Sequence, residues 1–442
     1  MESEDVSTKQ QRIAELARIH PEVSFTSLAY HIDLRWLHEA YLRTRKDGAV
    51  GIDEQTAEDY QKNLGPNLRS LLEQAKSGNY RAPPVRRAHI PKGSSRKETR
   101  PIGIPTFSDK VLQRAVSMVL EPLYEQEFLN CSYGFRPGRS AHDALNALWK
   151  QAMGTDGGWI IDLDIQKFFD TLDKKHLRDI LKRRVSDGVI LRLIGKWLNA
   201  GVWEKGETSY PEKGTAQGGV ISPILSNIYL HEVLDKWFEE VVKPRLKGKG
   251  FLIRYADDGI LGFENEEDAR RVMEVLPKRF AKYGLTIHPE KTRMVRFARP
   301  ESEPPKDHKR EKRETFNFLG FTHYWGKSRK GNWVIKRSTE KGRFARALKK
   351  VSDWCRRNRH LPISEQLRQL TRKLTGHYAY YGITGNFRSL SNFRAEVTRV
   401  WHKWLSRRSR SGRIAWEKFN LLLRRYTLPP VRIMHSVFSA NL

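Results

Sequence analysis

The 442-residue chain has only two cysteines, no long apolar run and few acidic residues in its last third. Cys131 and Cys355 lie far apart, which excludes a cysteine zinc site and gives no sign of a disulfide framework. A bound metal ion would therefore need oxygen ligands. No stretch reaches the roughly 18 consecutive apolar residues of a membrane span, and the acidic, polar N-terminus is unlike a secretion signal. The sequence therefore predicts a globular, cytoplasmic protein with no membrane partner.

Acidic residues are scarce where basic residues are most abundant. The formal net charge is +30, and residues 301–442 contain 33 Lys and Arg against 10 Asp and Glu. A smaller basic cluster, residues 81–100, has seven basic residues and one acid. Such surfaces suit a phosphate backbone and predict salt-sensitive binding of nucleic acid; a solvated or membrane-surface face is the alternative. The six tryptophans of the last 142 residues favour ordered structure over a flexible basic tail.

The apolar patterns predict an α+β chain. We expect strands around 80–106, 159–165, 251–263, 288–292, 315–324 and 332–337. We expect helices within 10–75, at 108–128 behind a Ser-Asp cap, at 174–199, from Ser222, at 266–283, and three or four after 340. The charged, proline-containing stretch 298–314 is the best candidate boundary.

The stretch KGRFARALKKVSDWCRRNR predicts a helix with two different faces. Phe344, Leu348, Val351 and Cys355 form one apolar stripe, which indicates core packing. The basic residues fall largely away from this stripe, so we expect the basic face to be the functional one.

Acidic residues stand at the ends of the predicted strands. In FLIRYADDGILGF, the pair Asp257 and Asp258 is flanked by β-formers and followed by Gly259, which predicts a tight hairpin; a solvated turn is the alternative. Asp162 and Asp164 share one face of another strand. If the strands are adjacent, these acids would repel unless divalent cations bridged them, and Mg²⁺ suits carboxylate oxygens. Two such ions about 3.5 to 4 Å apart support in-line phosphoryl displacement, so the pattern indicates nucleotidyl transfer.

Five motifs occur in a fixed order: DIQKFFD, GTAQGGVISPILSNIYL, YADD, GLTIHPEKT and FNFLGF. In this order they resemble the successive palm motifs of reverse transcriptases. IPKGSSRKETRPIGIP and YGFRPGRSAHDAL, with the helical N-terminal extension, resemble specifically the group II intron-encoded reverse transcriptases, also called maturases. The resemblance covers roughly residues 10–325 motif by motif, and the later helices and LPPVRIMHSVF are similar to that family's thumb and tail.

The resemblance implies a right-hand polymerase, with fingers and an antiparallel palm sheet that carries the catalytic acids, followed by an α-helical thumb or maturase domain. We expect a helical extension at 1–80 and fingers and palm at 81–300. Primer-grip strands and the helical thumb would occupy 301–385, and a basic DNA- or RNA-binding segment 386–442.

The resemblance also implies a catalytic site that holds two Mg²⁺ ions, for which Mn²⁺ would be a substitute. Asp164 and Asp257 would be metal ligands, and Asp258 the second acid of the pair. Lys291 would protonate the pyrophosphate leaving group or neutralise its charge; a simple surface lysine is the alternative.

For the incoming deoxynucleotide, the resemblance implies a pocket closed by Phe169 against a 2′-hydroxyl; a core phenylalanine beside Phe168 is the alternative. Lys92 and Arg100 would hold the triphosphate. Gln217 and Gly218 would lie where the backbone approaches nucleotide and template.

For the nucleic acid, the resemblance implies a primer-grip strand and a basic helix. The strand would present Phe318, Leu319 and Gly320, although its alternation also fits ordinary packing. The helix would present Arg343, Arg346, Lys349, Lys350, Arg356 and Arg357. The implied partners are deoxynucleotides, an RNA template with a DNA primer, the intron RNA and target DNA, which implies association with the nucleoid.

The implied function is an RNA-directed DNA polymerase of a group II intron that also assists splicing and retrohoming. A host reverse transcriptase for defence or repair and a non-catalytic RNA-folding maturase are alternatives, and an RNA-directed RNA polymerase is opposed mainly by Phe169. The sequence to Leu442 holds no cysteine and histidine pairs of an endonuclease, so we do not expect second-strand cleavage.

Overall fold

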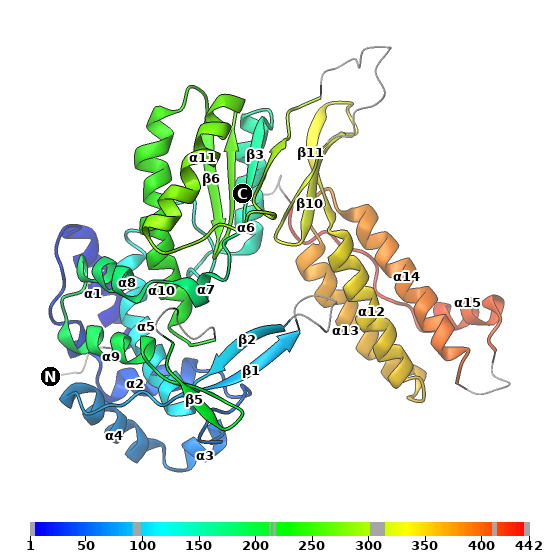
Figure 1. Cartoon of the computed structure of the whole chain (residues 1–442). Coiled ribbons are helices and arrows are strands. Elements are labelled where there is room, and N and C mark those ends of the chain that lie inside the picture. Colours follow the sequence, from blue (N-terminus) through cyan, green and yellow to red (C-terminus); the bar gives the residue numbers. More distant parts are fainter. Residues whose placement is uncertain are drawn as a thin grey trace. The chain divides into compact units, whose positions relative to one another are not determined.

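The computed structural model describes residues 5–91, 99–211, 214, 218–300, 314–408 and 413–436 (Figure 1). The chain divides into two compact units. The N-terminal unit comprises Met1–Ala144 and Ile161–Met294, and the C-terminal unit comprises Leu145–Ile160 and Val295–Leu442. Among the described residues, no helix combines the length and the apolar character needed to cross a membrane.

The N-terminal unit begins with the predicted short helices: α1 Val6–Ile19, η1 Leu28–His31, α2 Leu34–Arg43, α3 Ala57–Lys62 and α4 Leu64–Ser77. They pack on α5, Phe107–Tyr124; the fully buried Trp36 donates its indole N–H to the Ala115 carbonyl of that helix (2.9 Å). The predicted cap of α5, Ser108, is wrong by two residues, and the helix ends at Tyr124 rather than at 128. The cap is Thr106, whose hydroxyl accepts the N–H of Asp109, so the helix begins at Phe107.

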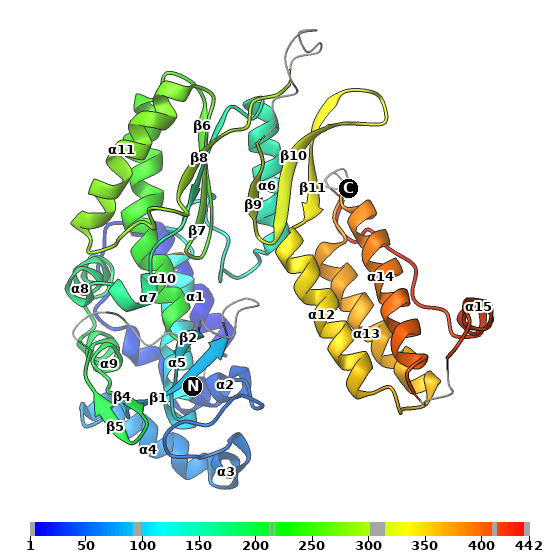
Figure 2. The ribbon, with the colours of Figure 1, turned by 45° about the vertical axis from the view of Figure 1, so that its right-hand side comes forward.

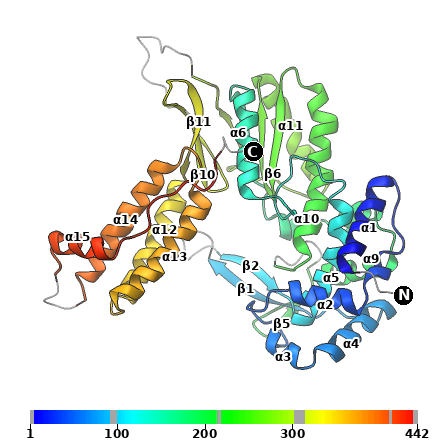
Figure 3. The same ribbon diagram turned by 180° about the vertical axis from the view of Figure 1, so that it is seen from behind.

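The first sheet of this unit has the strand order β2-β1-β4-β5. Its strands are β1 Val85–Pro91, β2 Thr99–Ile104, β4 Val202–Glu204 and β5 Glu207–Ser209. β1 and β2 are antiparallel, as predicted, and Figure 3 shows them as a two-stranded ribbon.

One predicted helix is wrong: residues 174–199 form two helices, α8 Lys174–Lys182 and α9 Gly188–Leu198. The break occurs at Asp187, whose carboxylate accepts the N–H groups of Val189 and Ile190 and thereby caps the second helix. Just before it, Val185 pairs with Phe25 in an isolated bridge, which diverts the chain.

The second sheet has the order β6-β7-β3-β8. Its strands are β6 Gly250–Tyr255, β7 Asp258–Phe263, β3 Trp159–Leu163 and β8 Arg293–Arg296. The residues of β3 and of β8 are divided between the sequence ranges of the two units. α10 (Ser222–Leu230), extended by π-helical turns at His231–Asp235 and Trp237–Val242, and α11 (Glu266–Lys282) lie on the same side of β6 and β7 (Figure 2).

The C-terminal unit combines a small sheet, order β11-β10-β9, with four helices. Its elements are β9 Phe316–Phe318, β10 Phe321–Lys327, β11 Trp333–Thr339, α12 Lys341–Arg357, α13 Ile363–Tyr381, α14 Phe387–Leu405 and α15 Trp416–Arg425. Figure 2 shows α12, α13 and α14 side by side. α6, Ala141–Gly154, crosses from one range into the other.

The four C-terminal helices share one hydrophobic core, which extends from Val351 to Leu428. The apolar stripe predicted on α12 is confirmed: Val351 and Cys355 are buried, and Phe344 and Leu348 pack partly buried against the same core. The boundary predicted at residue 385 therefore does not separate two packing units. Of the predicted connector, residues 301–313 lie outside the described part of the chain. The prediction of a mixed α and β chain with a helical C-terminal region is confirmed.

Candidate active site

The YADD motif forms a β-hairpin with a two-residue turn. β6 and β7 are antiparallel, and Tyr255 pairs with Asp258, which leaves Ala256 and Asp257 in the turn. Ala256 has φ of 56°, in the left-handed region that favours glycine. The predicted hairpin is therefore confirmed. It places Asp257 at the tip and Asp258 at the first position of β7.

Asp164 follows β3 and is tied to the segment that precedes β8. Its backbone N–H donates to Thr292 Oγ1 (3.1 Å), and its carbonyl accepts the N–H of His288 (2.8 Å). Its carboxylate Oδ2 lies 3.6 Å from Lys291 Nζ, and the two side chains are 38% and 49% exposed, respectively. The fold therefore brings together the predicted ligand and the predicted lysine from motifs more than a hundred residues apart.

Asp162 lies on the same strand and has a basic partner of its own. Its Oδ2 is 3.7 Å from Nε of Arg293 in β8. Burial raises the pKa of Asp162 to about 6; the Arg293 guanidinium opposes this rise, and the charge of Asp164 adds to it. Asp162 and Asp164 therefore each lie near a basic residue in or before β8. The electrostatic interaction between the two carboxylates agrees with the prediction that they share one face of their strand.

A glycine contact brings the end of β3 against the start of β7. The two strands are neighbours in the sheet, and a Cβ built on Gly259 would lie 3.3 Å from Leu163 Cδ2. Leu163 directly precedes Asp164, and Gly259 directly follows Asp258. The acids of DLDIQ and of YADD therefore lie at the same edge of the sheet.

This acidic edge has the chemistry of a divalent metal site. Carboxylates are hard donors, and Mg²⁺ characteristically binds one or two of them and completes its shell with water and substrate phosphates. Asp164 is partly exposed, as such a ligand must be. No group of three or more His, Cys, Asp or Glu side chains suited to hold a metal ion is present in the described ranges.

The two phenylalanines of DIQKFFD differ in burial. Phe168 is 2% exposed, whereas Phe169 is only partly buried and places its ring edge-on to Phe168, with 5.2 Å between centroids. Lys167, with φ of 47°, turns the chain at the start of α7, Phe168–Thr171. The core role therefore belongs to Phe168, and part of the Phe169 ring is exposed.

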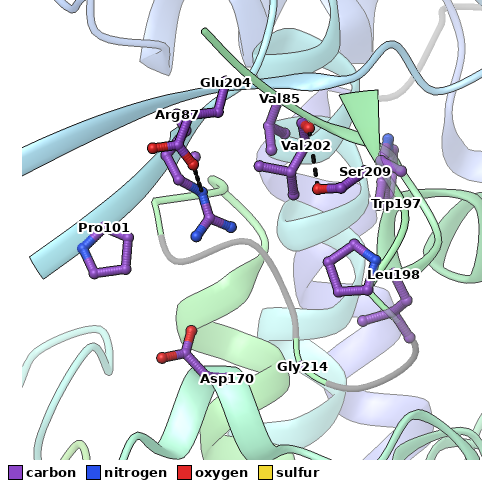
Figure 4. Close-up of a pocket in the computed structure, with 13 residues that line it drawn as sticks. Val85, Arg87, Pro101, Asp170, Trp197, Leu198, Val202, Glu204, Ser209 and Gly214 are labelled. Carbon is purple, nitrogen blue, oxygen red and sulfur yellow. Dashed lines mark hydrogen bonds and ion pairs between the residues drawn. The ribbon is translucent and has the colours of Figure 1, made fainter. Parts of the chain in front are cut away.

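A cavity of about 340 Å³ adjoins this segment. Figure 4 shows Asp170 on one side of the cavity, with Pro101 and Arg87 from the β1–β2 sheet on the other. Arg87 Nε lies 3.9 Å from Glu204 Oε2 at the rim. Gly214, which also lines the cavity, passes so close to this segment that a Cβ there would lie 2.7 Å from the Phe169 carbonyl oxygen.

The glycine-rich loop contacts β2 at Gly218, whereas the approach of Gln217 and Gly218 to nucleotide and template stays a prediction. Gly218 has φ of 115°, and a Cβ there would lie 2.5 Å from Ile102 Cγ2, so only glycine fits. Arg100 is exposed on the same strand, opposite Ile90. Lys92 and Gln217, two further predicted nucleotide-binding residues, lie outside the described residues.

The motif FNFLGF is not one strand, which corrects the prediction. β9 ends at Phe318, which pairs with Phe321 of β10, so Leu319 and Gly320 form a two-residue turn with φ of 49° and 80°. Positive φ at both turn positions is the geometry that fits tight hairpins. Phe318 is 4% exposed and has a packing role, and Tyr380 holds the turn by donating its hydroxyl to the Leu319 carbonyl (2.8 Å).

The predicted basic helix is present as α12, and of its six predicted basic residues five are exposed and Arg346 is partly buried. The exposed ones are Arg343, Lys349, Lys350, Arg356 and Arg357. A second basic surface is an open groove of about 770 Å³ between the end of α12 and the end of α14. No acidic residue lines it, and its basic lining residues are Arg359, His402, Lys403, Arg407, Arg408 and Arg413. Both surfaces suit an anionic polymer.

Comparison with known proteins assigns the family. Residues 90–323, more than half of the chain, match the family described as reverse transcriptase (RNA-dependent DNA polymerase). The chain belongs to the reverse transcriptase family. Reverse transcriptases use divalent metal ions, which agrees with the acidic edge formed by β3 and the YADD hairpin.

Several similar proteins have names that refer to introns. The chain is 36% identical to Protein YkfC of Escherichia coli over 242 residues, which cover 53% of this chain and 63% of that protein. It is 31% identical to the group II intron-encoded protein LtrA of Lactococcus lactis over 303 residues, 65% of this chain and 50% of LtrA. It is 28% identical to Nuclear intron maturase 2, mitochondrial, of Arabidopsis thaliana over 177 residues, 31% of this chain and 24% of that protein. The resemblance to group II intron reverse transcriptases is confirmed, and the chain spans roughly half to two thirds of the length of the first two relatives.

Sequence reasoning missed the buried residues that pack against the YADD turn of the reverse transcriptase site. Arg254, Asp235 and Asn227 are buried polar residues behind the YADD turn. Gly134 of YGFRPG packs on that turn, since a Cβ there would lie 2.3 Å from the Ala256 nitrogen. One signal was available: an arginine within the apolar run FLIRY requires a buried counter-charge.

Proposed function

We propose that this reverse transcriptase is the RNA-directed DNA polymerase of a group II intron and that it also binds the intron RNA to assist splicing and mobility. The observation that supports this most is the joint placement of Asp164, Lys291 and the YADD hairpin at one sheet edge. Extension of a DNA primer on an RNA template tests the polymerase activity. Splicing of the intron RNA at low Mg²⁺, with and without the protein, tests the maturase role.

In this proposal the sheet β6-β7-β3-β8 is the palm of a right-hand polymerase, β1 and β2 belong to the fingers, and α12 to α14 form the thumb. The helices of residues 1–80 extend the fingers, and residues 386–442 bind DNA or RNA. Asp164 and Asp257 hold two Mg²⁺ ions, with Asp258 beside them and Mn²⁺ as a substitute. When bound, these ions stabilise the attacking and leaving oxygens of nucleotidyl transfer.

The chain's own groups then act on the nucleotide. Arg100 and Lys92 hold the triphosphate, Gly218 allows the backbone near Gln217 to approach the base pair, and Lys291 donates a proton to the leaving pyrophosphate. The position of Lys291 beside Asp164 supports this assignment, because a proton donor must lie within reach of the reacting phosphates.

Phe169 excludes ribonucleotides in this account. Replacing Phe169 with Val removes the ring that would meet a 2′-hydroxyl, while Phe168 keeps the core contact. We expect the preference for deoxynucleotides over ribonucleotides to fall by about tenfold to a hundredfold, the usual range for a steric contact in a pocket. The measurement is the ratio of kcat/KM for dCTP and CTP. If Phe169→Val discriminates against ribonucleotides as well as wild type does, another residue excludes the 2′-hydroxyl.

The C-terminal unit holds the template-primer duplex and the intron RNA through phosphate contacts. The exposed cations of α12 and the basic groove at the ends of α12 and α14 support this proposal. No acidic residue lines the groove, and of the α12 cations Arg343 lies 3.7 Å from Glu340. Phe318 and Gly320 are buried and Leu319 is only partly buried, so in this proposal Leu319 is the part of the primer grip that approaches the primer backbone.

Salt dependence tests this surface. Replacing both Arg356 and Arg357 with Gln should weaken RNA binding and reduce the slope of log affinity against log salt by about 1.5 to 2, the value for two lost phosphate contacts. The measurement is RNA affinity at several salt concentrations. A matched control is Arg368→Gln, because Glu365 already pairs with that guanidinium at 2.7 Å. An equal change in both proteins would show that α12 is only a solvated face.

A further inference from the structure

Arg254 is an arginine in the centre of the N-terminal unit with no exposure to solvent. It lies in β6, one residue before Tyr255 and two before the YADD turn residue Ala256. A buried guanidinium is costly unless its charge and all of its N–H groups are satisfied. The partners of Arg254 therefore indicate which part of the structure the buried charge stabilises.

All five N–H donors of Arg254 have acceptors. Nε and Nη2 donate to the two oxygens of Asp235 (2.7 and 2.6 Å), which forms a bidentate pair with 0% exposure on both sides. Nη1 donates to Asn227 Oδ1 and to the Ala256 carbonyl (both 2.9 Å), and Nη2 also donates to Ser132 Oγ (2.7 Å). One guanidinium thus joins three segments of the chain: the loop at Ser132, the helix that carries Asn227 and Asp235, and the YADD turn.

The partners of Arg254 come from segments that pack next to the YADD turn. Asp235 and Asn227 come from α10 and its π-helical extension, and Ser132 comes from the loop that leads into YGFRPG. Asn227 also donates to the Gly134 carbonyl (2.8 Å), and Gly134 is the residue whose missing Cβ lets the loop touch the turn. The loop and the turn are therefore fixed against each other by one network.

The turn needs such support because its first residue is strained. Ala256 is a residue with a Cβ at φ of 56°, a conformation that costs free energy outside glycine. The bond from Arg254 to the Ala256 carbonyl is made at this strained residue, immediately before Asp257. The positive charge of Arg254 is also coupled electrostatically to Asp257.

We propose that Arg254 is a positioning residue: through the Ala256 carbonyl and the Asp235, Asn227 and Ser132 contacts, it holds the YADD turn in the conformation that presents Asp257 to a divalent metal ion. This inference rests on the proposed polymerase function. Arg254 touches neither metal nor nucleotide in this account and acts only through Asp257. A lysine cannot replace it, because one ammonium cannot reach five acceptors in a planar fork.

The first test uses Arg254→Lys in the full chain with a bound template-primer. We expect Mn²⁺ affinity, measured by electron paramagnetic resonance without nucleotide, to fall about tenfold, as for one lost charge-assisted hydrogen bond. Extension at saturating deoxynucleotide should slow by about tenfold or more, while KM for the template-primer stays within about twofold of wild type.

The control is Arg184→Lys. Arg184 is also nearly buried and ion-paired, with Glu127, but its other bonds go to the N-terminal segment near His20 and Val23. The Arg184→Lys variant should have a lower midpoint temperature of thermal unfolding and an unchanged Mn²⁺ affinity. Equal losses of Mn²⁺ affinity in both variants would overturn the inference, because they would reflect general destabilisation.

Ser132→Ala keeps the inference testable if Arg254→Lys does not fold. It removes one acceptor and leaves the Asp235 ion pair in place, so we expect Mn²⁺ affinity to fall by a smaller factor, about threefold, with template-primer KM unchanged. Wild-type Mn²⁺ affinity in this variant would overturn the inference. Absence of primer extension by the wild-type protein would instead overturn the proposed function on which the inference rests.

Discussion

Asp257→Asn should abolish DNA synthesis and leave the fold and the RNA affinity intact. Asp257 stands at the tip of the hairpin turn, so an isosteric amide changes its charge and disturbs little packing. Loss of an anionic metal ligand removes several kcal/mol of transition-state stabilisation, which corresponds to a rate reduction of about a thousandfold or more. Single-turnover primer extension measures the rate, and filter binding measures RNA affinity.

The matched control for this prediction is Asp179→Asn, which removes an exposed carboxylate of α8. It should extend primers at the wild-type rate. The extension rate of Asp258→Asn should lie between the rates of Asp257→Asn and Asp179→Asn, because Asp258 begins β7 and is the second acid of the pair. Normal extension by Asp257→Asn would contradict the assignment of this carboxylate as a metal ligand.

Lys291→Ala should slow nucleotide addition by about a hundredfold, within the range of general acid catalysis. The reason is that Lys291 Nζ lies 3.6 Å from the carboxylate of Asp164, the proposed metal ligand beside which the pyrophosphate would leave. Among the described residues, no other basic side chain is paired with that carboxylate. The measurement is the single-turnover rate of nucleotide addition at saturating deoxynucleotide, compared with that of wild type.

Lys291→Arg separates the two chemical roles of this lysine. Arginine keeps the positive charge but does not release its proton at working pH. If proton donation matters, Lys291→Arg should be as slow as Lys291→Ala. Near-normal activity of Lys291→Arg would show that Lys291 only neutralises charge, and the proton donor would have to be sought elsewhere.

Much of the site could be predicted from sequence because its residues stand at the ends of regular elements. The alternation around Asp164 and the two apolar runs around Asp257 and Asp258 identify the strands and a tight hairpin between them. The structure places the turn one residue earlier than the acidic pair, at Ala256 and Asp257, so that Asp258 begins β7. Gly218 was predicted only to lie where the backbone approaches nucleotide and template. The contact that the structure shows, between Gly218 and Ile102 of β2, could not be predicted from the composition of the loop.

Other features could not be predicted because they depend on partners distant in the chain. The acceptors of Arg254 come from residues 132, 227, 235 and 256, and no local pattern connects them. The break at Asp187 depends partly on its bond to the N–H of Ala29, far away in sequence. FNFLGF reads as an alternating strand because Gly320 falls in register with Phe316 and Phe318. Only the Phe318–Phe321 pairing shows that it is a turn.

The central claim is that the acids at the edge of β3 and the YADD hairpin catalyse RNA-templated DNA synthesis. The most direct measurement is extension of a DNA primer on an RNA template with Mg²⁺, supplied in parallel with deoxynucleotides or ribonucleotides. The account predicts full-length product with deoxynucleotides, little or none with ribonucleotides, and none with Asp257→Asn. Tight RNA binding without extension by either nucleotide set would contradict it.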